Sequence, residues 1–326
     1  MRLFHHFYLT VCSVAALAGG HAVAQTPNFP GKPITMVMPY TPGSSSDNEA
    51  RIYQEGLQEH FKQQLLIDYK PGASNMIANS YVAKQKPDGY TLVYTVATSA
   101  ILPAFKEDLN FDMLKDLATV SLTTRRTFVL VANPSLPANN YAEYVAYARA
   151  NPGKVTWSSV GPGGALHMSG EWLAAGAGIK LLFVHYKGSA TAELDLLAGR
   201  IDSSPKALIS ALPIIKSGKA KVIAVITGQR SPLLPDVRTV AEQGIPGYDY
   251  PGWVGIMTTG GTPAAIVNQL SAAFKAAITA PRAMKSWEAQ GTTPVGSTPE
   301  EFRKALTAEM AMWKKLVRDN NIKADE

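Results

Sequence analysis

Short apolar runs alternate with longer segments of helical periodicity along most of the chain. The runs are rich in β-branched and aromatic residues, a composition that favours strands. They occupy residues 34–38, 64–69, 90–96, 128–133, 154–160, 181–186 and 221–227. Because the segments between most of them are long enough for a crossover helix, this order predicts parallel strands with helices on both faces of the sheets.

The intervening segments repeat apolar residues about every 3.6 positions. In residues 47–62, for example, Ala50, Tyr53 and Leu57 share one face of a helix. The same pattern predicts helices at residues 76–85, 140–150, 165–177, 190–199, 206–217, 263–280, 281–290 and 298–320. With 326 residues available for two domains, the predicted fold class is α/β, with two mostly parallel sheets flanked by helices.

The first 24 residues have the pattern of a cleavable export signal. Arg2 precedes an apolar stretch that runs from about residue 8 to 19, and Ala22-Val23-Ala24 forms an A-x-A cleavage motif. The apolar stretch is too short to span a bilayer comfortably. The pattern therefore predicts an exported chain that is cleaved after Ala24.

Removal of this signal also removes the single cysteine of the chain, Cys12. Cys12 as a lipid anchor is an alternative, but it would then lie in the middle of the apolar run. A mature chain that lacks Cys12 has no cysteine, and therefore no disulfide and no thiolate chemistry. The net charge of +6 falls to +5 with the loss of Arg2. The basic residues are scattered and do not alternate with aromatic ones, so we expect no nucleic-acid partner.

Five loops rich in small residues follow predicted strands, at residues 42–47, 71–75, 97–100, 161–167 and 187–191. The carboxyl ends of parallel strands meet at one edge of a sheet, where α/β proteins bind ligands. Each following helix offers unpaired N–H groups and the positive end of its dipole. Together the loops predict a cleft that holds a carboxylate. Alternatively, the first loop, "PGSSSD", is an ordinary helix-capping turn.

Catalytic and metal-binding signatures are missing from the sequence. It contains no G-x-S-x-G, no G-x-x-x-x-G-K-[ST] and no H-E-x-x-H motif. "GPGGALH" departs from the dinucleotide fingerprint at Leu166. The three histidines left after processing are badly spaced for a metal. We expect no cofactor and no metal. The remaining enzymatic alternative is a hydrolase or lyase that uses His167 as a base.

A series of collinear motifs covers nearly the whole mature chain. They include "KPDGYTL", "NPGKVTWSSVGPGG", "YKGSATAELDLLAGRID" and "RSPLLPDVRTVAEQGIPGY". On these motifs the chain resembles Bug-type periplasmic solute-binding proteins, the receptors of tripartite tricarboxylate transporters. The resemblance implies a two-domain Venus-flytrap fold, with residues 25–124 and 249–326 in the first domain and residues 125–248 in the second. It also implies a periplasmic monomer that works with the membrane subunits of such a transporter.

The resemblance further implies which residues bind the ligand. From the first domain they are Tyr40, Gly43, Ser44, Ser45, Ser46, Asp47, Ala73, Ser74, Asn75, Thr98 and Ser99. From the second domain they are Gly163, Gly164, Ala165, His167, Gly188, Ser189 and Lys206.

Two residues refine the expected ligand. Lys206 stands where the resembling proteins often carry aspartate, and a lysine there favours a second carboxylate over an ammonium group. The alternative for Lys206 is a helix-terminal side chain in water. Trp253 is either a ligand contact or a packed interdomain aromatic. The predicted function is capture of an aliphatic or aromatic dicarboxylate for transport; a sensory receptor for the same ligands is the alternative.

Overall fold

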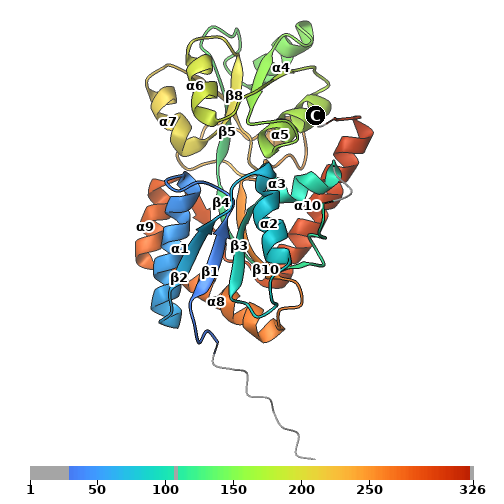
Figure 1. Ribbon diagram of the computed structural model, residues 1–326. Helices are drawn as coiled ribbons and strands as arrows, with labels where there is room; N and C mark the ends of the chain where they lie inside the picture. The colour runs from blue at the N-terminus through green and yellow to red at the C-terminus, as the bar shows by residue number, and fades with distance from the viewer. Residues whose placement is uncertain (1–28, 106–108, 324–326) are drawn as a thin grey trace, which may run out of the picture.

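The computed structural model describes residues 29–105 and 109–323, which form two α/β lobes (Figure 1). The predicted signal peptide and its cleavage site lie outside these residues. The first lobe is built on a six-stranded sheet in the order β11-β4-β10-β3-β1-β2, and the second on a five-stranded sheet in the order β7-β6-β8-β5-β9. The first sheet contains β1 (Ile34–Met38), β2 (Leu65–Tyr69), β3 (Thr91–Val96), β4 (Leu117–Arg126), β10 (Trp253–Thr259) and β11 (Thr292–Pro294). The second contains β5 (Phe128–Ala132), β6 (Thr156–Ser159), β7 (Leu182–His185), β8 (Ser203–Ala207) and β9 (Lys221–Val225).

Helices cover both faces of each sheet, as the alternating sequence pattern predicts. In β1, Met36 and Met38 pack into one apolar cluster and Val37 into another, because successive side chains of a strand point to opposite faces. On the first sheet, one face carries α1 (Ser45–Phe61), α8 (Ala264–Thr279) and α9 (Pro281–Ala289), and the other carries α2 (Met76–Ala83), α3 (Thr98–Ile101) and α10 (Pro299–Asp319). On the second sheet, α4 (Tyr141–Ala150) and α5 (Ala165–Ala177) lie opposite α6 (Ser189–Leu197) and α7 (Leu208–Lys216).

Both sheets are mixed rather than parallel throughout. β1 pairs in parallel with β2 and β3, and β6 pairs in parallel with β7 and β8. The antiparallel pairs involve β4, β5 and β10, which are the strands next to the points where the chain passes between the sheets. β5 and β10 enter their sheets from the other lobe. Each runs antiparallel to the strands that crossover helices connect within that sheet.

The helix predicted from residue 206 begins at Leu208 instead, and residues 203–207 form β8. The sequence "SSPKA" lacks the apolar run that marks the other strands of this sheet. It is a strand because β5 pairs with it along its whole length and β6 pairs with it at Ser203. Tertiary pairing thus outweighs local composition here.

The chain crosses between the lobes twice, and the two crossing segments are bonded to each other. The first crossing lies between Arg126 and Phe128, and the second precedes Trp253. The Arg126 N–H donates to the Gly252 carbonyl at 2.9 Å. A Cβ on Gly252 would lie 2.5 Å from the Arg126 carbonyl oxygen, so this close approach requires glycine. The predicted domain limits at 124/125 and 248/249 stay a prediction, although the strands change sheet near these positions.

The lobes also meet through aromatic side chains away from the crossings. Trp172 of α5 packs edge-on against Trp313 of α10, with ring centroids 5.6 Å apart. Trp172 also packs against Tyr248 at 4.7 Å. This contact therefore joins a helix of the second lobe to the last helix of the first. Across the described ranges, no helix has both the length and the apolar character needed to cross a membrane.

Candidate ligand-binding site

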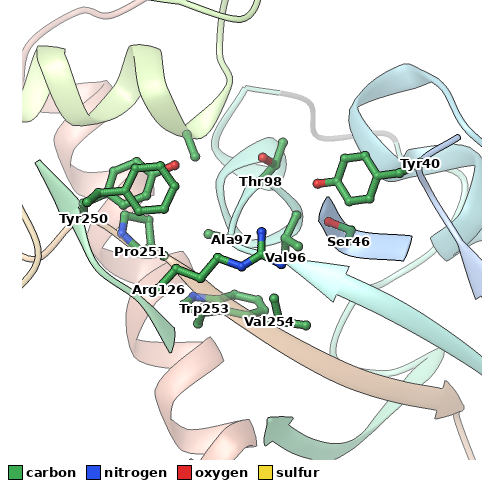
Figure 2. Close-up of a pocket in the computed structure, with 13 residues that line it drawn as sticks. Tyr40, Ser46, Val96, Ala97, Thr98, Arg126, Tyr250, Pro251, Trp253 and Val254 are labelled. Carbon is green, nitrogen blue, oxygen red and sulfur yellow. The ribbon is translucent and has the colours of Figure 1, made fainter. Parts of the chain in front are cut away.

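A cavity of about 130 Å³ lies where the two lobes meet (Figure 2). Its walls come from the loops after β1 and β3, from both crossing segments and from the start of α5. The lining residues are Tyr40, Ser46, Val96, Ala97, Thr98, Arg126, Phe128, Ala165, Tyr250, Pro251, Gly252, Trp253 and Val254. Of the residues predicted to bind ligand, the cavity brings together Tyr40, Ser46, Thr98 and Ala165.

The residues of the first loop, 42–47, fall into two groups: some stabilise the loop and one lines the cavity. Ser44 is the N-cap of α1, and its hydroxyl accepts from the Asp47 N–H at 3.1 Å. The Asp47 carboxylate accepts from the Gly43 N–H at 2.9 Å and from the Tyr69 hydroxyl at 2.6 Å. Ser46, by contrast, lines the cavity. Gly43, Ser44 and Asp47 thus hold the loop in shape.

The electrostatics of Asp47 agree with this structural task. Burial favours a raised pKa for Asp47, but the hydrogen bonds from Tyr69 and Gly43 and the nearby Arg51 charge outweigh it, so the pKa lies below its ordinary value. Asp47 is therefore a charged, well-paired carboxylate. The Asp47 carboxylate would therefore not stabilise a bound anion.

The loops that follow β2 and β3 place their polar residues differently. Ser74 and Asn75 adopt left-handed backbone conformations with φ of 51° and 77°, and Asn75 is buried while Ser74 is exposed. Thr98 lines the cavity, but the Ser99 hydroxyl accepts from Asn79 at 2.8 Å inside the first lobe. Ser74, Asn75 and Ser99 shape the neighbouring loops rather than line the cavity. Ala73 begins the 3-10 turn that follows β2, and Ser45 is the first residue of α1.

In the second lobe, His167 stabilises the loop that precedes α5. Its Nδ1 accepts from the Gly163 N–H at 3.0 Å, and its Nε2 lies 3.4 Å from the Glu171 carboxylate. Gly164 is the N-cap of α5, and Ala165, the first helical residue, lines the cavity. Because the Nδ1 lone pair is engaged and the ring is buried, the geometry favours a structural role for His167 over that of a base.

The start of α6 and Lys206 lie on the same side of the second lobe. Gly188 is the N-cap of α6, and Ser189 is its first residue. Lys206 is not helix-terminal, because it belongs to β8, and it is buried rather than in water. Its Nζ lies 2.6 Å from the Glu193 carboxylate of α6. Contact between Lys206 and a ligand stays a prediction, and Lys206 is not among the residues that line the cavity.

Arg126 is the cationic group in the cavity, and the sequence reasoning missed it. Its side chain is 20% exposed and pairs with the fully buried Glu49 carboxylate of α1. Burial favours a lowered pKa for Arg126, but the Glu49 charge outweighs it and raises the pKa above the ordinary value. Figure 2 shows Arg126 between Tyr250 and Pro251 on one side and Tyr40 and Ser46 on the other.

Glu49 is bonded by more than the arginine. Its carboxylate also accepts from the hydroxyls of Tyr53, of Tyr94 at 3.0 Å and of Thr124 at 2.5 Å. The sequence held a signal for this network, because Glu49 lies four residues before Tyr53 and therefore on the buried face of the predicted helix. A carboxylate buried on that face requires a cation and hydrogen-bond donors.

Aromatic residues form the remaining walls. The rings of Phe128 and Tyr250, one from each crossing segment, lie 4.3 Å apart. Trp253 both lines the cavity and packs in the apolar cluster of α10, and its contact with a ligand stays a prediction. Its indole N–H donates to Glu309 at 2.6 Å, and the Trp313 indole donates to the same carboxylate at 3.1 Å. Burial raises the pKa of Glu309 to about 7.

Metal binding finds no support in this arrangement. Within residues 29–105 and 109–323, no three or more histidine, cysteine, aspartate or glutamate side chains gather where they could hold a metal ion. The chemistry of the cavity is that of hydroxyl groups, one guanidinium and aromatic rings.

Two α/β lobes, crossing segments that are paired with each other and a cavity at the junction define a solute-binding protein of the periplasmic-binding-protein fold. The sequence model of the tripartite tricarboxylate transporter family receptor matches residues 49–322, and the chain belongs to this family. The predicted family and fold class are therefore confirmed. Members of this class are binding receptors rather than enzymes.

Individual relatives agree with this assignment. Protein BugT of Bordetella pertussis is 30% identical over 310 residues, which cover 94% of this chain and 95% of the relative. A protein of R. palustris solved with adipate is 31% identical, with a TM-score of 0.78 over 90% of this chain and 99% of the other. MatC of Rhodopseudomonas palustris, solved with bound malate, is 26% identical, with a TM-score of 0.75 over 89% and 100% of the two chains.

Proposed function

We propose that the protein is a periplasmic receptor that captures a small dicarboxylate between its lobes and delivers it to the membrane subunits of a tripartite tricarboxylate transporter. The observation that carries this proposal is the cavity at the junction, which is lined from both lobes and contains Arg126 beside the hydroxyls of Tyr40, Ser46 and Thr98. The two similar proteins solved with adipate and with malate support a dicarboxylate as the ligand.

Ligand capture proceeds by closure of the two lobes around the crossing segments. The first lobe and the crossings contribute most of the cavity wall, and the second lobe contributes the start of α5. Contacts that form only in the closed state supply the free energy that shifts the protein toward it. In this proposal the domain limits are those expected above, and the chain works as a monomer and catalyses no reaction.

The test is a thermal-shift screen of residues 25–326 against adipate, malate, succinate, citrate, benzoate, phthalate, terephthalate, glutamate and aspartate. A ligand at a hundred times its Kd stabilises the folded state by about 2.7 kcal/mol, which raises Tm by a few degrees. We expect hits among dicarboxylates that lack an amino group. Hits confined to amino acids would contradict the dicarboxylate assignment, and no hit at all would contradict carboxylate binding.

Turnover is checked with the same samples. The best ligand is incubated with the protein and followed by nuclear magnetic resonance. We expect the ligand to remain intact. Conversion that disappears in His167→Ala while binding survives would instead establish the enzymatic alternative.

A further inference from the structure

We propose that the Arg126 guanidinium binds one carboxylate of the ligand directly and selects for its negative charge. This inference rests on the proposed function, since it concerns the same cavity. It goes further because it assigns a residue that neither the loop pattern nor the resemblance identified. It also replaces helix N-termini by a side-chain cation as the main anion contact.

The first argument is the number of donors that Arg126 has to spare. A guanidinium carries five N–H donors in a planar fork. In the part of the chain that the structure describes, Glu49 is the one side chain that bonds to this guanidinium, and it does so through Nη2. Arg126 also lines the cavity, and a fifth of its side chain is exposed. The other N–H groups are therefore available to a molecule in the cavity.

The second argument is that the guanidinium is already held in place. The Glu49 carboxylate is fully buried, and it accepts hydrogen bonds from three hydroxyl groups as well as from Arg126. The negative charge of Glu49 is thus satisfied by four donors within the protein. A held guanidinium loses less conformational entropy when it binds a carboxylate, because its fork is already oriented.

The third argument is the environment of the cavity. Phe128, Tyr250 and Trp253 line the cavity beside Arg126 and give it aromatic walls. Charge-assisted hydrogen bonds between a guanidinium and a carboxylate strengthen when water is displaced. A neutral amide of the same shape cannot accept two such charge-assisted bonds. The cavity should therefore discriminate an acid from its amide.

The experiment measures Kd by calorimetry for the tightest carboxylate of the screen and for its neutral amide. The variants are Arg126→Gln, Arg126→Lys and the double variant Glu49→Gln/Arg126→Gln. The double variant removes both charges together and keeps one acceptor oxygen for the surrounding hydroxyls, so it tests binding even if Arg126→Gln alone fails to fold. Arg125→Gln is the matched control, because Arg125 pairs with Asp249 and does not line the cavity.

Loss of the guanidinium should weaken carboxylate binding by about 10- to 100-fold, in the range of hydrogen bonds to charged groups. Amide binding should change little, so the preference for the acid should shrink in Arg126→Gln and in the double variant. Arg126→Lys should retain part of the affinity, because it keeps the charge and loses the fork. Arg125→Gln should bind like the wild type.

Two results would overturn the inference in distinguishable ways. If the wild-type protein binds a carboxylate and the folded double variant binds it equally well, Arg126 is not the anion contact, and the receptor function stands. If the wild-type protein binds no carboxylate in the screen, the proposed function fails and the inference fails with it. An equal loss in Arg125→Gln would assign the effect to general charge rather than to the cavity.

Discussion

Arg126 and Lys206 are both cations paired with a glutamate on a helix, but the surroundings of the two pairs differ. Glu49, the partner of Arg126, is fully buried and accepts three hydroxyl groups as well. Glu193, the partner of Lys206, is 34% exposed and can turn to water. The comparison teaches that burial of the counter-charge decides whether a pair is a fixed part of the structure or a replaceable contact.

Stability should separate the two pairs most strongly. Arg126→Ala leaves Glu49 as an unpaired buried charge, and we expect a loss of about 3 kcal/mol in the free energy of unfolding. Lys206→Ala leaves a glutamate that can become hydrated, so we expect about 1 kcal/mol or less. Urea denaturation of the two variants measures both values. Equal losses would mean that the two pairs are not different in kind.

Glu309 provides a third case, a half-buried carboxylate that has no basic side chain in hydrogen-bond contact among the residues that the structure describes. Burial raises its pKa to about 7 from 4.5. Between these values the folded state keeps a proton that the unfolded state has released. Stability therefore falls as pH rises through this window, by on the order of 1–3 kcal/mol in total, and the loss is complete above about pH 7.

The variant Glu309→Gln checks this expectation, because glutamine cannot ionise. Its unfolding free energy should lack the fall between pH 4.5 and 7 and should exceed that of the wild type at pH 8. Denaturation curves at several pH values give the slope. A variant that retains the wild-type slope would show that another group titrates in this window.

The first loop offers a finer comparison between two serines. Ser46 lines the cavity, so Ser46→Ala should weaken ligand binding by roughly fivefold, or about 1 kcal/mol. Ser44 caps α1, so Ser44→Ala should lower the unfolding free energy by about 1 kcal/mol. Calorimetry and denaturation on both variants separate the two effects. The reverse assignment would contradict the placement of this loop.

The smallest expected effect is that of Lys206 on binding. Because Glu193 already neutralises Lys206, Lys206→Ala should weaken binding by less than about threefold for monocarboxylates and dicarboxylates alike. Paired Kd values for benzoate and terephthalate, or for the tightest acids of each class, measure this. A loss confined to dicarboxylates would restore Lys206 as the contact for a second carboxylate.

The sequence predicts many of the elements that depend on local patterns, but β4 and β10 are not among the predicted strands although both contain β-branched residues. The apolar runs at β1, β3 and β5 and the periodicity of α1 and α10 lie where the structure has them. The strands β8 and β11 could not be predicted in this way, because "SSPKA" and "TTP" have no strand pattern of their own. They are strands through pairing with residues that are distant in the sequence.

The candidate site likewise has parts that local composition predicts and parts that it does not. The serine-rich loop at residues 42–47 and the glycine-rich loop at residues 161–167 are recognisable by composition, and Ser46 and Ala165 from these loops line the cavity. Arg126 and Glu49 lie 77 positions apart, so no spacing rule connects them. The neighbours of Lys206 in the sequence likewise did not reveal that Glu193 would face it, and contact between Lys206 and a ligand stays a prediction.

The contact between Trp172 and Trp313 gives the protein an internal optical reporter. Two of its five tryptophans meet across the lobes, one on α5 and one on α10. The fluorescence of an indole depends on its immediate neighbours, so rotation of one lobe against the other should alter the emission of this pair. Closure should then be visible in unlabelled protein by stopped-flow fluorescence, and Trp172→Phe should remove the signal.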